Sequence, residues 1–162
     1  MRILVISDTH RSLGKVYSVL KDINDKIDAV IHCGDVVEDV YRLKSMYPDL
    51  KFYKVKGNCD YGSSEPDEET FILCGKKFFI THGHNYSVHW STDRLYYKAL
   101  EVGADICVYG HTHIPSIENC NGIILINPGS LSQPRGGSTY SYGKIKIENG
   151  VIDPTKVEYK QR

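Results

Sequence analysis

Five short apolar, β-branched segments recur along this chain, and each is followed at once by residues that can bind a metal ion. Segments of this kind prefer extended strands. The motifs therefore belong at the ends of five strands, and an α/β fold in which those ends meet would gather them at one edge. The segments and motifs are ILVIS before Asp8-Thr9-His10, AVIHC before Gly34-Asp35, FYKVK before Gly57-Asn58, FFIT before His82-Gly83-His84 and ICVY before Gly110-His111-Thr112-His113.

The side chains in these motifs offer carboxylate oxygens, an amide oxygen and imidazole nitrogens. This mixture of donors suits manganese, nickel, iron or zinc in a catalytic centre better than a structural zinc site built on cysteines. Side chains two residues apart at a strand end point to the same side, so Asp8 with His10, or His111 with His113, can reach one cluster of ions. The sequence predicts a catalytic metal centre, with manganese as the first choice.

Predicted strands and helices alternate early in the chain, and strands dominate later. Val16, Leu20 and Ile23 recur at helical spacing, and Pro48 ends the second helix. This order predicts an α/β fold in which parallel strands are joined to antiparallel ones. We expect strands at 2–7, 28–33, 51–56, 69–74, 76–81 and 105–109, helices near 13–26, 37–47 and 91–103, and further β segments from 115 to 159.

The length of 162 residues fits a single domain, 1–162, whose core needs no disulfide. The formal net charge of +0 argues against a protein that binds nucleic acid through a broad basic field, so no sequence-specific nucleic acid is expected as a partner. No apolar run approaches the length of a membrane span, and no leader-like segment precedes the first strand. We expect a soluble cytoplasmic protein with no membrane partner.

Five cysteines form no C-x-x-C pair, and most of them fall in apolar strand runs. Their odd number and their positions predict buried free thiols in a reducing compartment. They are Cys33, Cys59, Cys74, Cys107 and Cys120.

Taken in order, the motifs resemble the signature of the calcineurin-like metallophosphoesterases: D-x-H, G-D, G-N-[HCN]-[DE], a histidine and then G-H-x-H. The chain looks most similar to the small YfcE-type phosphodiesterase branch because residues 57–60, 81–84 and 127–130 read GNCD, THGH and NPGS. The resemblance implies a four-layer α/β/β/α sandwich, in which two mixed β-sheets pack face to face with helices outside.

The resemblance also implies the ligands of two divalent ions, with Asp35 bridging both. One ion would be bound by Asp8, His10, Asp35 and His113, and the other by Asp35, Asn58, His82 and His111. Four of these residues, Asp8, Asp35, Asn58 and His82, would act in catalysis through the metals.

Such a centre implies hydrolysis of a phosphodiester, or of a phosphomonoester, by a hydroxide that bridges the ions. Two divalent ions, the carboxylates of Asp8 and Asp35 and the hydroxide leave a charge of roughly +1 for an anionic phosphate to meet. The expected partner is a small phosphoester substrate, and a homo-oligomer is left open.

Two other functions fit part of the pattern. The retromer scaffold subunit has the same fold with an impaired metal site and acts through protein contacts, so the fold alone does not establish activity. Here all seven ligand positions carry competent residues, which favours an enzyme. A mononuclear hydrolase of the β-lactamase type is disfavoured because its H-x-H-x-D-H run is absent, and Ile114-Pro115 follows His113.

The main departure from the wider superfamily is Cys59, which stands where the phosphoprotein-phosphatase branch has a histidine that assists the leaving group. A thiol of ordinary pKa is a poor substitute. His84, two residues after His82, either replaces that acid or has a supporting or surface role. Simpler interpretations hold for the remaining candidates: core packing or support for His32, a surface or capping position for His89, an exposed turn for Arg11, and a rigid turn for the NPGS segment.

Overall fold

The computed structural model describes residues 1–23 and 26–160, and their elements follow the predicted order. The helix expected near 13–26 ends at Ile23 within the described residues, and its residues 24–25 lie outside them. The helices are α1 (Gly14–Ile23), α2 (Glu38–Met46), α3 (Asp93–Glu101) and the short 3₁₀ helix η2 (His84–Tyr86). The strands are β1 (Arg2–Ile6), β2 (Ala29–His32), β3 (Lys51–Lys54), β4 (Glu68–Leu73), β5 (Lys76–Thr81), β6 (Ile106–Val108), β7 (Ser116–Cys120), β8 (Ile123–Asn127), β9 (Ser141–Glu148) and β10 (Val151–Glu158).

The strands form two five-stranded sheets, sheet A with the order β10-β9-β1-β2-β3 and sheet B with the order β4-β5-β6-β8-β7. In sheet A, β1, β2 and β3 are parallel, and the β9–β10 hairpin adds antiparallel strands. In sheet B, β5, β6 and β8 are parallel, with β4 and β7 antiparallel at the edges. The prediction of parallel strands joined to antiparallel ones is confirmed.

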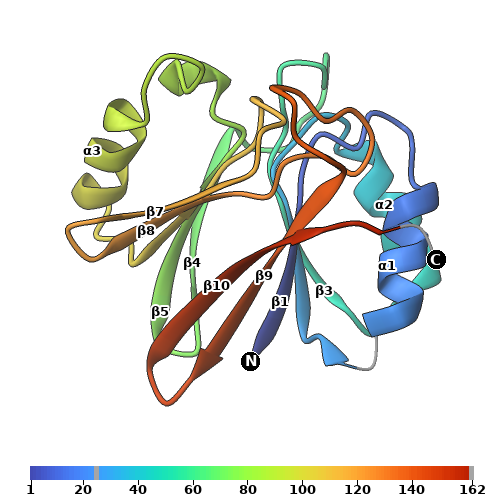
Figure 1. Cartoon of the computed structure of the whole chain (residues 1–162), viewed down its shortest axis with the longest axis horizontal. Coiled ribbons are helices and arrows are strands. Elements are labelled where there is room, and N and C mark those ends of the chain that lie inside the picture. The colour runs from blue at the N-terminus through green and yellow to red at the C-terminus, as the bar shows by residue number, and fades with distance from the viewer. Residues whose placement is uncertain (24–25, 161–162) are drawn as a thin grey trace.

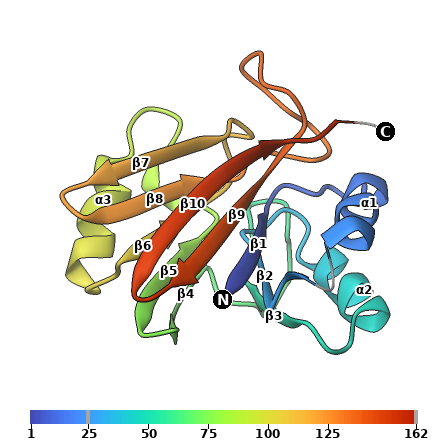
Figure 2. The same cartoon turned by 60° about the horizontal axis from the view of Figure 1, so that its bottom comes forward.

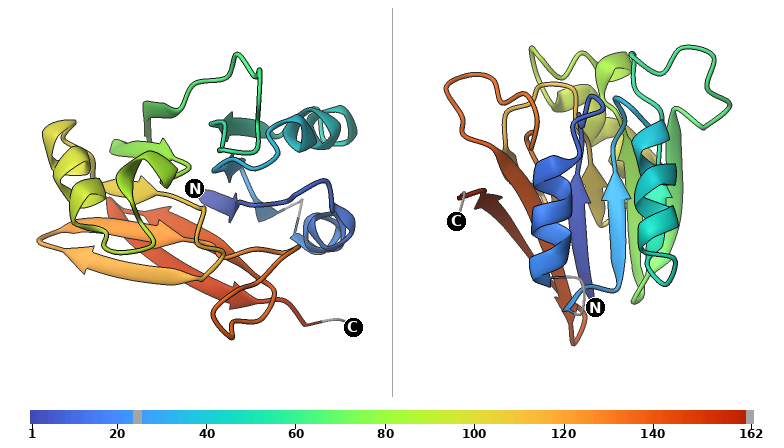
Figure 3. Two further views of the ribbon diagram at one scale, coloured as in Figure 1. Left: turned by 90° about the horizontal axis from the view of Figure 1, so that it is seen from above. Right: turned by 90° about the vertical axis from the view of Figure 1, so that its right-hand side faces the viewer.

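The two sheets pack face to face with helices on both outer sides (Figures 1 and 3). In β1, Ile3 and Val5 face the central layer between the sheets, whereas Leu4 and Ile6 pack toward α1 and α2. The helix α3 covers the outer face of sheet B. Strands covered on both faces appear in the sequence as continuous apolar runs. The four-layer α/β/β/α sandwich is confirmed.

The loops that follow the carboxyl ends of the parallel strands gather at one end of the sandwich, the top in Figure 1. The N-terminus and the turns of the β4–β5 and β9–β10 hairpins lie at the opposite end. Figure 2 shows that β10 of sheet A lies beside β7 of sheet B, so the sheets also meet along this edge. The five predicted motifs therefore share one end of the molecule.

Within the described ranges, none of the helices is both long and apolar enough to cross a bilayer. All five cysteines are free. The expectation that they are buried is right for Cys33 and Cys107 but wrong for Cys59 and Cys74, which are exposed. Cys59 lies in the loop after β3 and Cys74 at the β4–β5 turn, so neither is inside a strand.

Candidate metal centre

Asp35 lies between imidazoles from both sheets. It follows β2 and is buried, and its Oδ2 is 3.5 Å from Nε2 of His82 and 3.9 Å from Nε2 of His10. Oδ1 of Asp8, which follows the neighbouring strand β1, is 4.0 Å from the same nitrogen of His82. One carboxylate oxygen of Asp35 therefore faces ligand groups on two sides, the position that a bridging ligand needs.

We define the first half-site as Asp8, His10 and His113. One ligand atom from each of them lies within 4.8 Å of the others. Nε2 of His113 is 3.2 Å from Oδ1 of Asp8 and 3.4 Å from Nε2 of His10. Oδ1 of Asp8 is buried and has no hydrogen-bond partner among the described residues. Because a buried carboxylate oxygen is costly without a partner, this arrangement fits a divalent cation.

We define the second half-site as Asn58, His82 and His111. Oδ1 of Asn58 is 3.1 Å from Nε2 of His82. The ring of His111 lies 5.1 Å from that of His82 between centroids, and its backbone N–H donates to Oδ2 of Asp8 at 3.1 Å. All seven predicted ligands are thus brought to one edge of the sandwich. Amide oxygen, carboxylate oxygen and imidazole nitrogen together fit manganese, iron, nickel or zinc.

Backbone carbonyls orient two of the imidazoles. Nδ1 of His82 is 2.6 Å from the carbonyl oxygen of Cys33, and Nδ1 of His113 is 2.5 Å from that of Gln133. A carbonyl oxygen only accepts, so each Nδ1 carries the hydrogen and donates it. The lone pair of each Nε2 is then directed into the cluster, in the tautomer that metal-bound histidine requires.

The backbone of the centre is strained. Left-handed φ angles, which non-glycine residues rarely adopt, occur at Asp8, His10, Asp35, His111 and His113, with values of +54°, +45°, +47°, +70° and +59°. Such residues cost about 1–3 kcal/mol each and persist only where their surroundings hold them. Two glycines allow the close approach: a Cβ at Gly57 would lie 2.1 Å from Oδ1 of Asp35, and one at Gly110 would lie 2.8 Å from Oδ2 of Asp8.

A buried hydrogen-bonded chain supports the first half-site from α2. The N–H of Gly34 donates to Nδ1 of His32 at 3.2 Å, so Nε2 of His32 carries the hydrogen and donates to Oγ1 of Thr9 at 3.1 Å. The Thr9 hydroxyl donates to Oδ2 of Asp39 at 2.8 Å, and the N–H of Arg11 donates to the same oxygen at 2.9 Å. Burial lowers the pKa of His32 to about 4, so the ring is neutral at pH 7. A supporting role was one of the two interpretations of His32 from the sequence, but nothing in the sequence indicated such a role for Thr9 or Asp39.

Asp60 holds the loops of Asp35 and of the second half-site together. Its Oδ2 accepts the backbone N–H groups of Gly57 at 2.7 Å and of Asp35 at 3.1 Å, and its Oδ1 accepts that of Val37 at 2.7 Å. Asp60 belongs to the GNCD motif, so the pattern marked the position without indicating this function.

The loop after β8, for which the sequence favours a rigid turn, also fixes the backbone of the centre. The hydroxyls of Ser130 and Ser132 each donate to the carbonyl oxygen of Asp8 at 2.8 Å. Nδ2 of Asn127 donates to the carbonyl oxygen of Gly110 at 2.8 Å. Through these three side chains, the end of β8 and the loop after it hold the loop after β1 and the loop after β6 together.

The imidazoles differ in pKa because their surroundings differ. Burial, together with the neighbouring His82, lowers the pKa of His111 to about 4, and burial lowers the pKa of His10. Burial also acts to lower the pKa of His82, but the hydrogen bond and charge of Asp35 outweigh it, so that pKa is raised. Conversely, burial acts to raise the pKa of Asp35, and the contacts with His82 hold it well below the ordinary value.

His84 and Cys59 border the cluster. The ring of His84 lies 5.3 Å from that of His82 and 6.1 Å from that of His111, and its Nδ1 is buried with no hydrogen-bond partner in the described part of the chain. Burial lowers the pKa of His84, and so does the charge of His82. Desolvation of the sulfur and a hydrogen bond with Asp35 raise the pKa of Cys59 to about 11, so its thiol is a weak acid.

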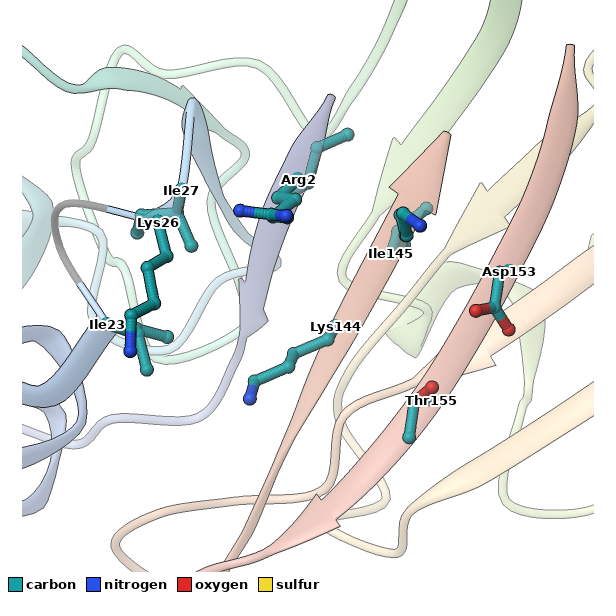
Figure 4. A pocket seen from close by; sticks show the side chains of 10 residues that line it. Arg2, Ile23, Lys26, Ile27, Lys144, Ile145, Asp153 and Thr155 are labelled. Carbon is teal, nitrogen blue, oxygen red and sulfur yellow. The ribbon is translucent and has the colours of Figure 1, made fainter. Parts of the chain in front are cut away.

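A hollow of about 350 Å³ lies at the end of sheet A opposite to the metal centre (Figure 4). Arg2, Lys144, Lys146 and Asp153 of adjacent strands line it. Lys146 is in register with both Arg2 and Asp153, and it forms an ion pair with Glu148 at 2.6 Å. Its lining includes neither histidine nor cysteine, so it is separate from the metal centre.

Residues 1–150 match the family model described as the calcineurin-like phosphoesterase superfamily domain. The chain belongs to this superfamily. The probable metallophosphoesterase YsnB of Bacillus subtilis is 37% identical over 150 residues, which are 92% of this chain and 86% of that protein. A phosphodiesterase of Methanocaldococcus jannaschii is 30% identical over 184 residues, covering 99% of this chain and 98% of that protein. The resemblance found in the motifs is confirmed, and the chain is a metal-dependent phosphoesterase.

Solved structures of the superfamily agree with this fold. A conserved protein of Streptococcus pneumoniae, described as a predicted phosphoesterase, superposes with a TM-score of 0.82 at 32% identity and covers 97% of this chain and 88% of its own. Vps29 of Entamoeba histolytica in complex with Zn²⁺ has a TM-score of 0.77 at 22% identity, with coverage of 97% and 98%. At that identity, the likeness to Vps29 concerns the fold alone.

Proposed function

We propose that this chain hydrolyses phosphodiesters at a centre of two divalent ions, with manganese as the first choice and nickel, iron or zinc as alternatives. The observation that carries the proposal is the position of Asp35, whose Oδ2 faces His10 of the first half-site and His82 of the second. Asp35 would be shared by the ions. The first half-site would complete one ion's ligands and the second half-site the other's.

Divalent ions held there would lower the pKa of water toward neutrality and neutralise charge on the phosphoryl oxygens. The protein's own part is to hold the ligands ready. Only Asp8 and Asp35 among the ligands carry negative charge, and Asn58 supplies a neutral oxygen, so the centre keeps a positive balance for an anionic substrate. The carbonyls of Cys33 and Gln133 keep the imidazoles of the two half-sites in the binding tautomer.

Phosphodiesters with good leaving groups are the substrates that the acid groups of the centre favour. The thiol of Cys59, with its raised pKa, gives a departing alkoxide little help. We assign proton donation to His84, whose ring lies beside His82 and His111 of the second half-site and whose Nδ1 has no partner among the described residues. The name of the Methanocaldococcus relative, a phosphodiesterase, supports this substrate class.

The test combines metal counting with turnover. Protein stripped with a chelator is reconstituted with manganese, and elemental analysis is run beside hydrolysis of bis(p-nitrophenyl) phosphate. We expect close to two ions per chain and turnover only in the reconstituted sample. Saturation at one ion would contradict the dinuclear centre even if turnover persists.

A non-catalytic scaffold on the same fold is the alternative function. It predicts that fully loaded protein turns over none of a panel of phosphodiesters, phosphomonoesters and nucleotides. We place the activity in one domain, 1–162, and the five free thiols support a reducing compartment such as the cytoplasm.

A further inference from the structure

A hollow of about 330 Å³ borders the metal centre on the side of sheet B. This volume lies in the range of small-molecule sites. Trp90 and Ile114 line it and are 92% and 43% exposed, and Tyr109 contributes a buried ring. The hollow thus combines a freely accessible indole with apolar surface.

The hollow adjoins the second half-site through His89. His89, which the sequence indicates as a surface residue and which is exposed, lines the hollow, and its ring lies 4.4 Å from that of His111. Thr112, between His111 and His113 in the chain, also lines it. A molecule whose phosphate lies on the metal centre can therefore extend a substituent into the hollow.

The hollow also contains a hydrogen-bond acceptor. Glu118 lines it, and the hydroxyl of Thr92 donates to Oε2 of Glu118 at 3.1 Å. Oε1 of Glu118 makes no hydrogen bond within residues 1–23 and 26–160, so it can accept one from a ligand. Ser116, on the same strand, already pairs with the hydroxyl of Tyr109 at 2.9 Å. The carboxylate favours a ligand that donates, such as an amino group.

We propose that this hollow binds the base of a nucleoside that forms one substituent of the phosphoester substrate. The base stacks on Trp90, and its amino group donates to Glu118. This inference rests on the proposed function for the phosphate end of the substrate, whereas binding of the base requires neither metal nor turnover. Stacking of one base on an aromatic side chain changes affinity by about 5- to 100-fold.

Trp90 is the single tryptophan of the chain, so its fluorescence reports directly on the hollow. Metal-free protein is titrated with adenosine, with purine riboside, which lacks the amino group, and with ribose 5-phosphate. We expect saturable quenching by adenosine, about 5-fold weaker binding of purine riboside and no saturable response to ribose 5-phosphate. Glu118→Gln should reduce the difference in affinity between adenosine and purine riboside.

A kinetic comparison tests the same contact in the manganese-loaded enzyme. Trp90→Ala should raise KM for the p-nitrophenyl ester of adenosine monophosphate by about 5- to 100-fold, with kcat and the hydrolysis of methyl p-nitrophenyl phosphate unchanged. Trp90→Phe should retain most of the preference for the nucleoside ester. The matched control is Tyr97→Ala, which removes a 65% exposed aromatic side chain from α3.

The outcomes separate the two proposals. If the manganese-loaded wild-type protein hydrolyses neither ester while adenosine still quenches the fluorescence of Trp90, the proposed function is refuted and the nucleoside site remains supported. Hydrolysis of the methyl ester without saturable quenching by adenosine would overturn the nucleoside site. Equal KM effects of Trp90→Ala on both esters would overturn it as well.

Discussion

The two half-sites meet at one edge of the sandwich, but the protein holds them with different firmness. In the first, Asp8 and His113 are buried, two serine hydroxyls fix the backbone of Asp8, and a carbonyl fixes the ring of His113. In the second, only His82 is fully buried. Asn58 is exposed, and the ring of His111 is half-buried among other imidazoles.

This difference has a consequence for the order of metal binding. Ligands that are already oriented lose little freedom when they bind an ion, and their supporting hydrogen bonds raise affinity. We therefore expect the first half-site to bind its ion more tightly. The second half-site, open toward solvent at Asn58, should exchange its ion more readily and leave room for the substrate.

The largest effect is expected at Asp35, the residue that we assign to both half-sites. Asp35→Asn should release both ions and lower hydrolysis of bis(p-nitrophenyl) phosphate by about 10³-fold or more. Asp153→Asn, which removes the same charge from exposed β10, is the control and should behave as wild type. Elemental analysis that still finds two ions in Asp35→Asn would exclude the shared ligand.

The next effect separates the half-sites. His113→Ala should abolish the tighter of the two manganese-binding steps and should reduce turnover by about 100-fold or more. His111→Ala should abolish only the weaker of two binding steps and cost roughly 10-fold. Isothermal titration calorimetry measures both steps. If the two variants lose the same manganese-binding step, the half-sites do not differ in affinity as we expect.

The fold and the ligands were readable because their signals are local. An apolar run such as ILVIS marks a strand covered on both faces, and Asp8 and His10 follow it directly. Family likeness then supplied the four layers and the pairing of ligands across the sheets, which strand periodicity alone does not contain.

The supporting residues could not be predicted in this way. Asp39 contacts Thr9 from α2 although it lies thirty residues later in the chain, and nothing beside Asp39 in the sequence marks it. The proximity of His89 to His111 depends likewise on how the segment after η2 turns back over sheet B. Contacts of this kind appear only once the layers are packed.

The supporting residues themselves should act mainly on one half-site each. Thr9→Val keeps the shape of the side chain but breaks the chain from His32 to Asp39, so it should weaken the tighter ion by about 10- to 100-fold. Asp60→Asn should act mainly on the second ion, because Asp60 holds the loop of Asn58 through Gly57, and to a smaller extent on both ions through the backbone of the shared Asp35. Calorimetry measures the steps, and Thr155→Val on exposed β10 is the control. A uniform loss in both variants would argue for a general effect on folding.

The smallest effect concerns protons in the metal-free protein, where His32 and His82 should change stability with opposite signs. Burial lowers the pKa of His32 behind the first half-site to about 4, whereas contacts with Asp35 raise the pKa of His82 in the second. Between pH 6.5 and about 4 the unfolded chain binds a proton at residue 32 that the folded chain does not. The free energy of unfolding should therefore fall with falling pH there, by roughly 1 kcal/mol per pH unit.

His82 contributes stability that is complete below pH 6.5 and is lost as the pH rises through its folded-state pKa. Urea unfolding in the presence of a chelator measures both slopes. His32→Gln should reduce the acid slope, to which the lowered pKa of His111 also contributes, and His82→Gln should reduce the slope above pH 6.5. His89→Gln, at an exposed position, should leave both slopes in place. An unchanged acid slope in His32→Gln would mean that this ring is not held neutral behind the first half-site.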